Sequence, residues 1–412
     1  MTALDPEALG ARAYAMIAEL ATISAEPDRL VRLFLSPEHR RAADLVARWM
    51  HEAGFSVSED ALGTLRGGFG SSRRRLLIGS HLDTVIDAGK YDGALGVIAG
   101  ILAAEPFARA KAKLPFGIDV LAFGDEEGSR FPATTASSSA CAGVFDQATL
   151  SLADADGVTL AAALRAYGKS PRDIAAAAYR PQDAAAYVEV HIEQGPVLEG
   201  KREPLGVVTG IVGQSRLRVT VTGKAGHAGT VPMHLRRDAY VGAAEMALAL
   251  EKIVRAHRDD GMVGTVGQIE VLPGAVNIIP SESVFTVDLR ALSDRLRKFA
   301  VERFQDEARR IATARGLGVA IETFHEIATA DCAPALQDQL AASIEDLGHN
   351  PIRLPSGAGH DAQVMAQLCP AAMLFVRCRG GISHNPAEFT SVSDMGLAIA
   401  ALIRFIERFQ GD

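Results

Sequence analysis

The chain has 412 residues, a length typical of two or three domains. Hydrophobic residues make up 48% of it and charged residues 22%, which is the balance of a globular protein and excludes a disordered or fibrous one. Lys+Arg total 42 against Asp+Glu 50, and the resulting net charge of −8 is spread without a long basic run. We therefore expect no nucleic-acid partner.

The cysteines Cys141, Cys332, Cys369 and Cys378 show neither a Cys-x-x-Cys pair nor the spacing of a disulfide framework, which fits a reducing cytoplasm. Residues 1–28 lack the basic start and apolar stretch of a signal peptide. No apolar run reaches membrane-spanning length, so we expect no membrane partner.

The first part of the chain alternates helical and strand patterns. Apolar residues recur at helical spacing over 5–54, and a short apolar strand follows at 75–79. A helix is predicted over 92–104 and a second apolar strand over 117–123. This alternation predicts an α/β fold with a largely parallel sheet, whose site lies at the carboxyl ends of the strands.

The middle of the chain has a different pattern. Residues 216–222 and 283–290 alternate apolar with polar side chains, as half-exposed antiparallel strands do, and a long helix is predicted between them. We therefore expect an inserted α+β domain at 213–326, within a discontinuous α/β domain made of 1–212 and 327–412.

His81 and Asp83 follow the first predicted strand, where a side chain would project into a cleft above the sheet. The His81 imidazole is a candidate metal ligand, and Asp83 could accept its other ring N–H and fix the tautomer. A His-x-Asp pair alone is a weak signal, and on its own it favours an ordinary hydrogen bond within the loop.

Three acidic side chains are further candidates. Asp92 precedes a predicted helix, where it could simply cap the backbone amides. Glu126 and Glu127 follow the strand at 117–123, and adjacent acids on a loop usually form a solvated surface. Neighbouring side chains of an extended segment point in opposite directions, however. One glutamate could thus ligate a metal while the other faces the substrate as a base.

His191 and His384 complete the set, although each could be a structural histidine. The candidate ligands lie at turns or strand ends flanked by glycine or proline, where rigid loops carry functional groups. Nitrogen and oxygen ligands without thiolate suit Zn²⁺, Mn²⁺ or Co²⁺. Two such ions sharing one carboxylate can polarise a carbonyl and lower the pKa of bound water to about 7.

Seven motifs of the sequence resemble, in the same order, those of the dinuclear metal amidohydrolases of the M20 peptidase superfamily. The similarity is to the branch of allantoate amidohydrolases, N-carbamoyl-L-amino acid hydrolases and β-ureidopropionases, and it covers nearly the whole chain. The motifs lie at 79–85, 90–93, 126–131, 191–195, 226–230, 357–361 and 381–385.

The resemblance implies an aminopeptidase-like catalytic domain with a central, mostly parallel sheet and an inserted ferredoxin-like lid and dimerisation domain. It also implies two divalent metal ions per subunit, Zn²⁺ or Mn²⁺, with Co²⁺ as a further candidate. In this family pattern Asp92 bridges the two ions, His81 and His191 complete one site, and Glu127 and His384 complete the other.

The resemblance further implies that Glu126 is the general base, which takes a proton from water and later delivers it to the departing nitrogen. Such a role is commonly worth about 10²–10⁴ in rate. The peptidase branches usually place a carboxylate where this chain has His191, so the histidine favours ureido substrates over peptides. Gln194 would lie beside the metals and contact the scissile group.

By the same similarity Arg290 and Asn277 hold a substrate carboxylate, which suits a guanidinium fork. From the residues alone, a surface ion pair between Arg290 and Asp288 is the simpler reading. The resemblance also implies that His227 stabilises the oxyanion, in its own subunit's site or across a dimer interface, and that His360 lines the cleft.

Residues 35–42 and 377–388 resemble the allantoate amidohydrolases in particular. One departure is Gly63-Thr64, where relatives often have Gly-Asn; it concerns a turn and leaves the metal chemistry untouched.

We therefore expect a cytoplasmic homodimer, joined through the lid domain, that hydrolyses the terminal ureido group of the small carboxylate allantoate to release ammonia and carbon dioxide. An N-carbamoyl-L-amino acid or 3-ureidopropionate amidohydrolase would use the same residues. An aminoacylase or metallo-aminopeptidase is a further alternative, against which His191 argues. A non-catalytic binding protein should lack a ligand or the base, and all of these residues are present.

Overall fold

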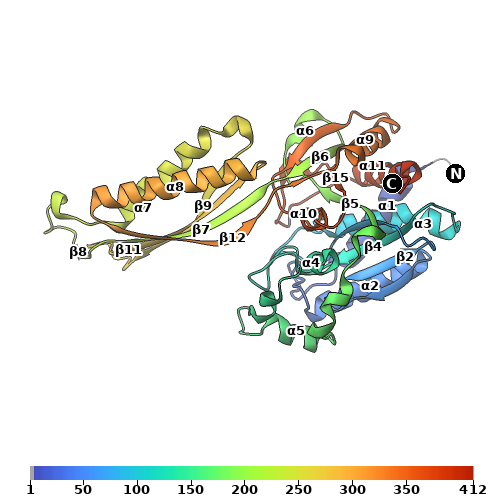
Figure 1. Cartoon of the computed structure of the whole chain (residues 1–412), viewed down its shortest axis with the longest axis horizontal. Helices are drawn as coiled ribbons and strands as arrows, with labels where there is room; N and C mark the ends of the chain where they lie inside the picture. Colours follow the sequence, from blue (N-terminus) through green and yellow to red (C-terminus); the bar gives the residue numbers. More distant parts are fainter. Residues whose placement is uncertain (1–3, 412) are drawn as a thin grey trace. The chain divides into compact units, whose positions relative to one another are not determined.

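The structure, a computed structural model, describes residues 4–411 and divides them into two compact units (Figure 1). One unit contains the chain up to Thr209 and from Asp331 onward, and the other contains Gly210–Ala330. The second unit includes the whole of the expected insert at 213–326 and extends beyond it at both ends.

The first unit is built on a mixed sheet with the strand order β1-β2-β4-β3-β5-β15-β6-β13, and β14 also pairs with β6. Its central strands β4, β3, β5 and β15 run parallel, while β1, β2 and β6 pair antiparallel toward the edges. The strands are β1 (Ser56–Glu59), β2 (Leu65–Phe69), β3 (Arg75–His81), β4 (Gly117–Phe123), β5 (Ala184–Ile192), β6 (Leu205–Ile211), β13 (Ala330–Asp331), β14 (Ile352–Ser356) and β15 (Ala371–Val376).

Every residue of β3, β4, β5 and β15 is buried. Their nearly continuous apolar sequences are those of parallel strands with both faces covered. Helices α3 and α11 pack against the sheet from the side opposite to α10 and α4 (Figure 1). The helices of this unit are α1 (Pro6–Ala21), α2 (Pro37–Glu52), α3 (Ala94–Arg109), α4 (Ala136–Ala142), α5 (Leu160–Ala166), α6 (Val197–Lys201), α9 (Pro334–Glu345), α10 (Asp361–Met365) and α11 (Val392–Arg408).

The expectation of continuous helix over 5–54 was wrong in its middle, because α1 ends at Ala21 and α2 begins at Pro37. Arg32 is buried in this break, where its guanidinium group binds backbone carbonyls. It donates hydrogen bonds to the backbone carbonyls of Leu20 and Ile23 at 3.2 Å and of Leu82 at 2.7 Å. Arg32 thereby adds side-chain hydrogen bonds to carbonyls at and just after the end of α1, and it connects this segment to the loop after β3.

The second unit has a ferredoxin-like βαββαβ order, with an antiparallel sheet arranged β12-β7-β11-β9. Helices α7 and α8 cover one face of this sheet (Figure 1). The main elements are β7 (Gly213–Thr222), α7 (Ala239–Arg255), β9 (Val263–Leu272), β11 (Glu282–Ala291), α8 (Asp294–Arg315) and β12 (Gly318–Ile327), and a short pair joins β8 (Gly226–His227) to β10 (Ile278–Ile279).

The alternating pattern of the second unit sorts its side chains as the sequence predicts. On β11, Phe285, Val287 and Leu289 are buried under the helices, whereas Asp288 and Arg290 are half-buried on the other face. None of the helices within residues 4–411 is long and apolar enough to cross a membrane.

Candidate metal centre

The candidate ligands of the first unit meet at one edge of the parallel sheet. His81 is the last residue of β3, Glu126 and Glu127 follow β4, and His191 is the second-last residue of β5. Parallel strands end at the same edge, so these side chains converge although they are far apart in sequence. Loops bring Asp92 and His384 to the same place.

Asp92 lies at the centre of this cluster. It does not cap α3, because the N-cap residue is Gly93 and no side chain caps that helix. One oxygen, Oδ1, lies 3.0 Å from His191 Nε2 and 3.6 Å from His81 Nε2. The other, Oδ2, lies 3.4 Å from His384 Nε2. The two oxygens of one carboxylate thus face two different sets of ligands.

The two adjacent glutamates have different nearest histidines, although ligand atoms of both also lie within 4.8 Å of one on His81, and their division into ligand and base stays a prediction. Glu127 Oε2 lies 3.5 Å from His384 Nε2, and Glu126 Oε2 lies 3.9 Å from His81 Nε2. Ligand atoms of Asp92, Glu127 and His384 lie within 4.8 Å of one another, and so do those of Asp92, His81 and His191.

The buried imidazoles are oriented by their second ring nitrogens. His81 Nδ1 lies 3.0 Å from the backbone oxygen of Asp83 and 3.5 Å from the Asp83 carboxylate. His191 Nδ1 lies 2.9 Å from the backbone oxygen of Ile192. An Nδ1–H donated to these oxygens leaves Nε2 as the neutral ligand atom, which is the arrangement found around metal-bound histidines.

Burial and charge shift the acids in opposite directions. Burial opposes ionisation of Asp92, but His191, His384 and His81 outweigh it and hold the Asp92 pKa well below its usual range. Burial raises the pKa of Glu126 well above its ordinary value, and it raises the pKa of Glu127 to about 7 with help from the Asp92 charge. Perturbed acids gathered in one place mark a candidate functional site.

The donor set fits two divalent ions. It consists of imidazole nitrogens and carboxylate oxygens, and the cysteines, all buried, contribute to none of the clusters found among residues 4–411. Such ligands suit Zn²⁺, Mn²⁺ or Co²⁺. Asp92, with an oxygen toward each group of ligands, has the geometry that a shared carboxylate needs.

Gln194 lies beside the cluster. Its Nε2 donates hydrogen bonds to Asp92 Oδ2 at 2.9 Å and to Ser383 Oγ at 3.0 Å. Gln194 and His384 both adopt left-handed backbone conformations, with φ of 55° and 53°. A non-glycine residue with such a backbone conformation typically costs on the order of 1 kcal/mol of folding free energy, and such residues cluster at functional sites.

His360 is buried behind the cluster, with 2% of its surface exposed. Its ring packs edge-on against the His191 ring at 4.5 Å, and its Nε2 lies 2.8 Å from Ser356 Oγ. The structure therefore places His360 against a candidate ligand, and its contact with substrate stays a prediction.

The second unit brings His227 and Asn277 together at its short β8–β10 pair, where the Ala228 amide donates to the Asn277 carbonyl at 2.9 Å. The Gly229 amide donates to His227 Nδ1 at 3.0 Å, so a neutral ring carries its hydrogen on Nε2. The exposed His227 can thus present a hydrogen-bond donor, which is what oxyanion stabilisation requires.

Arg290 is held by its neighbour on β11. Its Nε and Nη2 lie 2.9 Å and 3.1 Å from the two oxygens of Asp288. Asp288 also accepts hydrogen bonds from Gln214 and Arg216. The ion pair that the sequence suggested as the simpler reading is therefore formed, and a carboxylate role for Arg290 stays a prediction.

Three side chains contribute to the cluster in ways that the sequence did not predict. The Asp83 carboxylate accepts the backbone amides of Glu126 and Glu127, both at 3.2 Å, so it orients the loop that carries both acids. Ser383 and the buried Glu388 contact Asp92. Only their nearness to His384 in the sequence could have pointed to these two residues.

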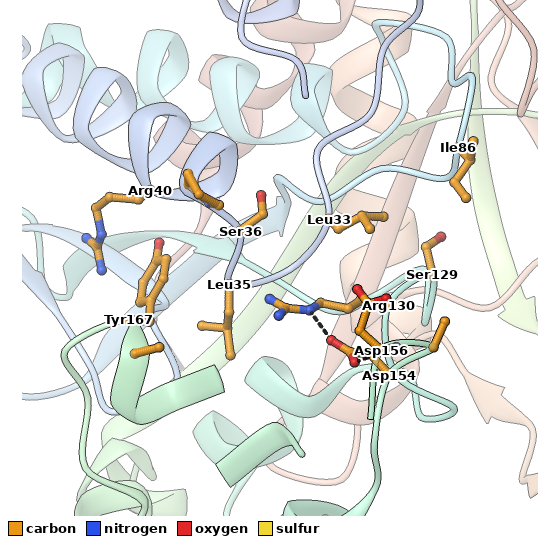
Figure 2. Close-up of a pocket in the computed structure, with 13 residues that line it drawn as sticks. Leu33, Leu35, Ser36, Arg40, Ile86, Ser129, Arg130, Asp154, Asp156 and Tyr167 are labelled. Carbon is orange, nitrogen blue, oxygen red and sulfur yellow. Dashed lines mark hydrogen bonds and ion pairs between the residues drawn. The ribbon is translucent and has the colours of Figure 1, made fainter. Parts of the chain in front are cut away.

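A separate cavity of about 670 Å³ lies next to the loops of the cluster (Figure 2). Ile86, from the loop after β3, and Ser129, two residues after Glu127, line it, and Arg130 pairs there with Asp154 at 3.1 Å. None of the described residues that line it is a candidate ligand, so the chemistry of the cluster lies outside this cavity.

Known proteins are similar to this chain over most of its length. The profile of the peptidase family M20/M25/M40 matches residues 77–408. A probable allantoate deiminase of Oryza sativa subsp. japonica is 41% identical, over 95% of this chain and 86% of its own length. An N-carbamoyl-L-amino acid amidohydrolase of Geobacillus stearothermophilus is 39% identical, over 95% of this chain and 97% of its own.

Solved structures are similar over nearly the whole chain. A hydantoinase/carbamoylase family amidase from Burkholderia multivorans matches with a TM-score of 0.87 at 33% identity, over 96% of this chain and 97% of its own. AtUAH in complex with glyoxylate matches with a TM-score of 0.85 at 30% identity, over 99% and 100%. The chain therefore belongs to the peptidase family M20/M25/M40, in its branch of hydrolases that cleave non-peptide C–N bonds.

Proposed function

We propose that this protein hydrolyses the ureido C–N bond of allantoate and releases ammonia and carbon dioxide. The observation that carries the proposed chemistry is the placement of Asp92 between two groups of ligands, with Glu126 beside them. The choice of allantoate is supported by relatives named allantoate deiminase, among them one from Arabidopsis thaliana that is 40% identical over 96% of this chain and 81% of its own length.

His81, His191 and Asp92 would hold one divalent ion, and Asp92, Glu127 and His384 would hold the other. Zn²⁺ or Mn²⁺ fits this set, and Co²⁺ would fit it as well. When bound, such ions polarise a carbonyl and make water acidic enough to act as a nucleophile near neutral pH.

Glu126 is proposed as the residue that moves the proton. Its carboxylate lies 3.9 Å from His81 Nε2 and belongs to neither of the two ligand groups that share Asp92. Burial raises its pKa. A carboxyl group with a raised pKa can accept a proton from water and still return it to the departing nitrogen. The Asp83 carboxylate keeps this loop in place through the Glu126 amide.

The remaining roles concern the substrate. Arg290 would bind the substrate carboxylate through its guanidinium fork, and Asn277 would hydrogen-bond to the same carboxylate. His227 would donate to the developing oxyanion, in its own subunit's site or in that of a partner subunit. Gln194, whose amide already reaches Asp92, would contact the scissile ureido group, and His360, which packs against His191, would line the substrate cleft.

An N-carbamoyl-L-amino acid is the second candidate substrate. It is favoured by the Geobacillus stearothermophilus relative, which this chain covers over 97% of its length. The same ligands and base would serve, and 3-ureidopropionate belongs to the same chemical class. Residues that contact the part of the substrate beyond the carboxylate and the ureido group would decide between them.

We also propose a homodimer formed through the second unit. Strand β9 is an edge of its sheet, and it exposes Val263, Ile269 and Leu272. An exposed apolar edge strand tends to pair with another chain. Pairing of β9 with β9 of a second copy would bury this edge with two-fold symmetry.

A cytoplasmic location is proposed as well. Cys141, Cys332, Cys369 and Cys378 are all buried as free thiols, which is the usual state of cysteines in a reducing compartment.

The test of the proposed function is ammonia release from allantoate. Protein stripped with a chelator should be inactive, and added Mn²⁺ or Zn²⁺ should restore the reaction in the parent but not in E126Q. Ammonia release by the stripped protein, or none by the reconstituted parent, would refute the proposal.

A further inference from the structure

Glu388 is a buried carboxylate in the loop before α11, with 5% of its surface exposed. Its Oε1 accepts hydrogen bonds from the backbone amides of Tyr91 at 2.9 Å and of Asp92 at 3.1 Å. The side chain therefore fixes the backbone of the segment that carries the central acid of the cluster.

The other oxygen of Glu388 reaches the side chain of Asp92 through Ser383. The Ser383 hydroxyl lies 3.2 Å from Glu388 Oε2 and 3.0 Å from Asp92 Oδ2. Gln194 Nε2 donates to the same Ser383 oxygen and to the same Asp92 oxygen. Asp92 is thus held at its backbone and at one carboxylate oxygen by residues that share one network.

The absence of a side chain at Gly89 makes room for the Glu388 carboxylate. A Cβ built on Gly89 would lie 2.3 Å from Glu388 Oε1, so only glycine lets the segment before Asp92 close over the carboxylate. The contact between Glu388 and this segment is therefore built into the sequence of both loops.

The orientation of Asp92 matters because its two oxygens face different partners. Oδ1 faces His191 and His81, and Oδ2 faces His384. Rotation of the carboxylate about its Cβ–Cγ bond would take at least one oxygen away from its partners. A carboxylate that serves both groups needs support from outside the ligands.

We propose that Glu388 and Ser383 are positioning residues that keep Asp92 facing both ligand groups, and that they thereby set the affinity for the ion held by Asp92, Glu127 and His384. This inference rests on the two-ion centre of the proposed function. Neither residue is a ligand in it, and neither touches the substrate.

The test compares E388A, S383A and E388Q with the parent protein in calorimetric titrations of chelator-stripped protein with Mn²⁺ alone. In E388A and S383A one of the two ions should bind on the order of 10–100-fold less tightly, the usual effect of removing a partner that orients a ligand. The other ion should be retained. If E388A does not fold, S383A carries the test, because it leaves the backbone contacts of Glu388 intact.

E388Q is the conservative variant. Its amide oxygen can accept from Tyr91 and Asp92, and its amide nitrogen can donate to Ser383 Oγ. We expect E388Q to bind two ions nearly as the parent does. A merely structural link between two loops would instead lower the melting temperature of the variants and leave the Mn²⁺ affinities unchanged.

Asp60 offers a matched control. Its Oδ1 accepts the amides of Leu62 and Thr64, and its Oδ2 contacts the Cys141 thiol, so it repeats the contacts of Glu388 on another loop. D60A should lose thermal stability and keep both ions.

Unchanged Mn²⁺ binding in S383A and in folded E388A would overturn the inference, and so would an E388Q variant as impaired as E388A. These results would leave the proposed function standing. A parent that binds two ions yet releases no ammonia from allantoate would refute that function alone, and a parent that fails to bind two ions would refute both.

Discussion

Asp83 Oδ1 accepts the backbone amide of Glu126 at 3.2 Å, so the carboxylate beside one candidate ligand fixes the loop that carries the proposed base. The second Asp83 oxygen accepts the Glu127 amide in the same way. One side chain thus couples the ends of β3 and β4.

We predict that D83N lowers kcat on the order of 10–100-fold. An asparagine presents N–H groups to one of the two loop amides, and two donors cannot pair. The ion held by His81 should be retained, because the nearest partner of His81 Nδ1 is the backbone oxygen of residue 83. Metal analysis and steady-state kinetics check this, with D60N as the control for loss of a buried acceptor; parental kcat in D83N would contradict it.

E126Q should keep both ions and lose about 10²–10⁴ in turnover, because it removes proton transfer and leaves the ligands. In the parent, burial raises the pKa of Glu126, and a base works only when deprotonated. Its kcat/KM should therefore rise as pH rises through that pKa. Metal content and a pH profile are the measurements, and near-parental turnover in E126Q would remove Glu126 from the mechanism.

R290A should raise KM for a carboxylate substrate on the order of 10–100-fold, since hydrogen bonds to charged groups contribute about 1.5–3 kcal/mol. R290K should recover little, because lysine lacks the planar fork. D288N separates a substrate-binding role of Arg290 from a structural one, because it breaks the observed ion pair and leaves the guanidinium available to substrate. An unchanged KM in R290A would show that Arg290 only stabilises the sheet through its ion pair with Asp288.

His39 should make the folded protein sensitive to acid. It is buried beside Tyr167, and burial lowers its pKa from 6.5 to about 4. The unfolded chain therefore takes up a proton below about pH 6.5 that the folded chain refuses until about pH 4, so the free energy of unfolding falls as pH drops through this window.

Between about pH 7.5 and pH 5 this effect amounts to about 2 kcal/mol, at 1.36 kcal/mol per unit of pKa difference. Urea unfolding of the parent and of H39N at both pH values measures it, and the difference between the two proteins cancels groups that titrate in both. An equal loss of stability in H39N would contradict the assignment to His39.

The sequence was most informative where chemistry coincides with strand ends. His81 and Glu127 follow short apolar runs that predict buried parallel strands, and the carboxyl ends of such strands lie at the same edge of the sheet. The network of Glu388 could not be predicted in this way, because its contacts join loops almost 300 residues apart. The break between α1 and α2 was missed for a similar reason, since Arg32 stabilises it through a loop that lies beyond the next strands.

For Arg290, the sequence predicted the contact within the strand and could not decide whether the side chain also binds a ligand. Alternation on β11 correctly placed Arg290 and Asp288 on one face, and it therefore suggested their ion pair. Whether a guanidinium also binds a ligand depends on what approaches that face, which no pattern within the strand records.

The most direct test of the proposed function is the ratio of kcat/KM for allantoate to that for N-carbamoyl-L-amino acids, 3-ureidopropionate and a dipeptide, measured with the Mn²⁺-reconstituted protein and E126Q as the blank. We expect allantoate to be preferred by at least about tenfold, equivalent to about 1.4 kcal/mol of transition-state stabilisation. Preference for another ureido acid would contradict the proposed substrate, and preference for the dipeptide would contradict the proposed reaction class.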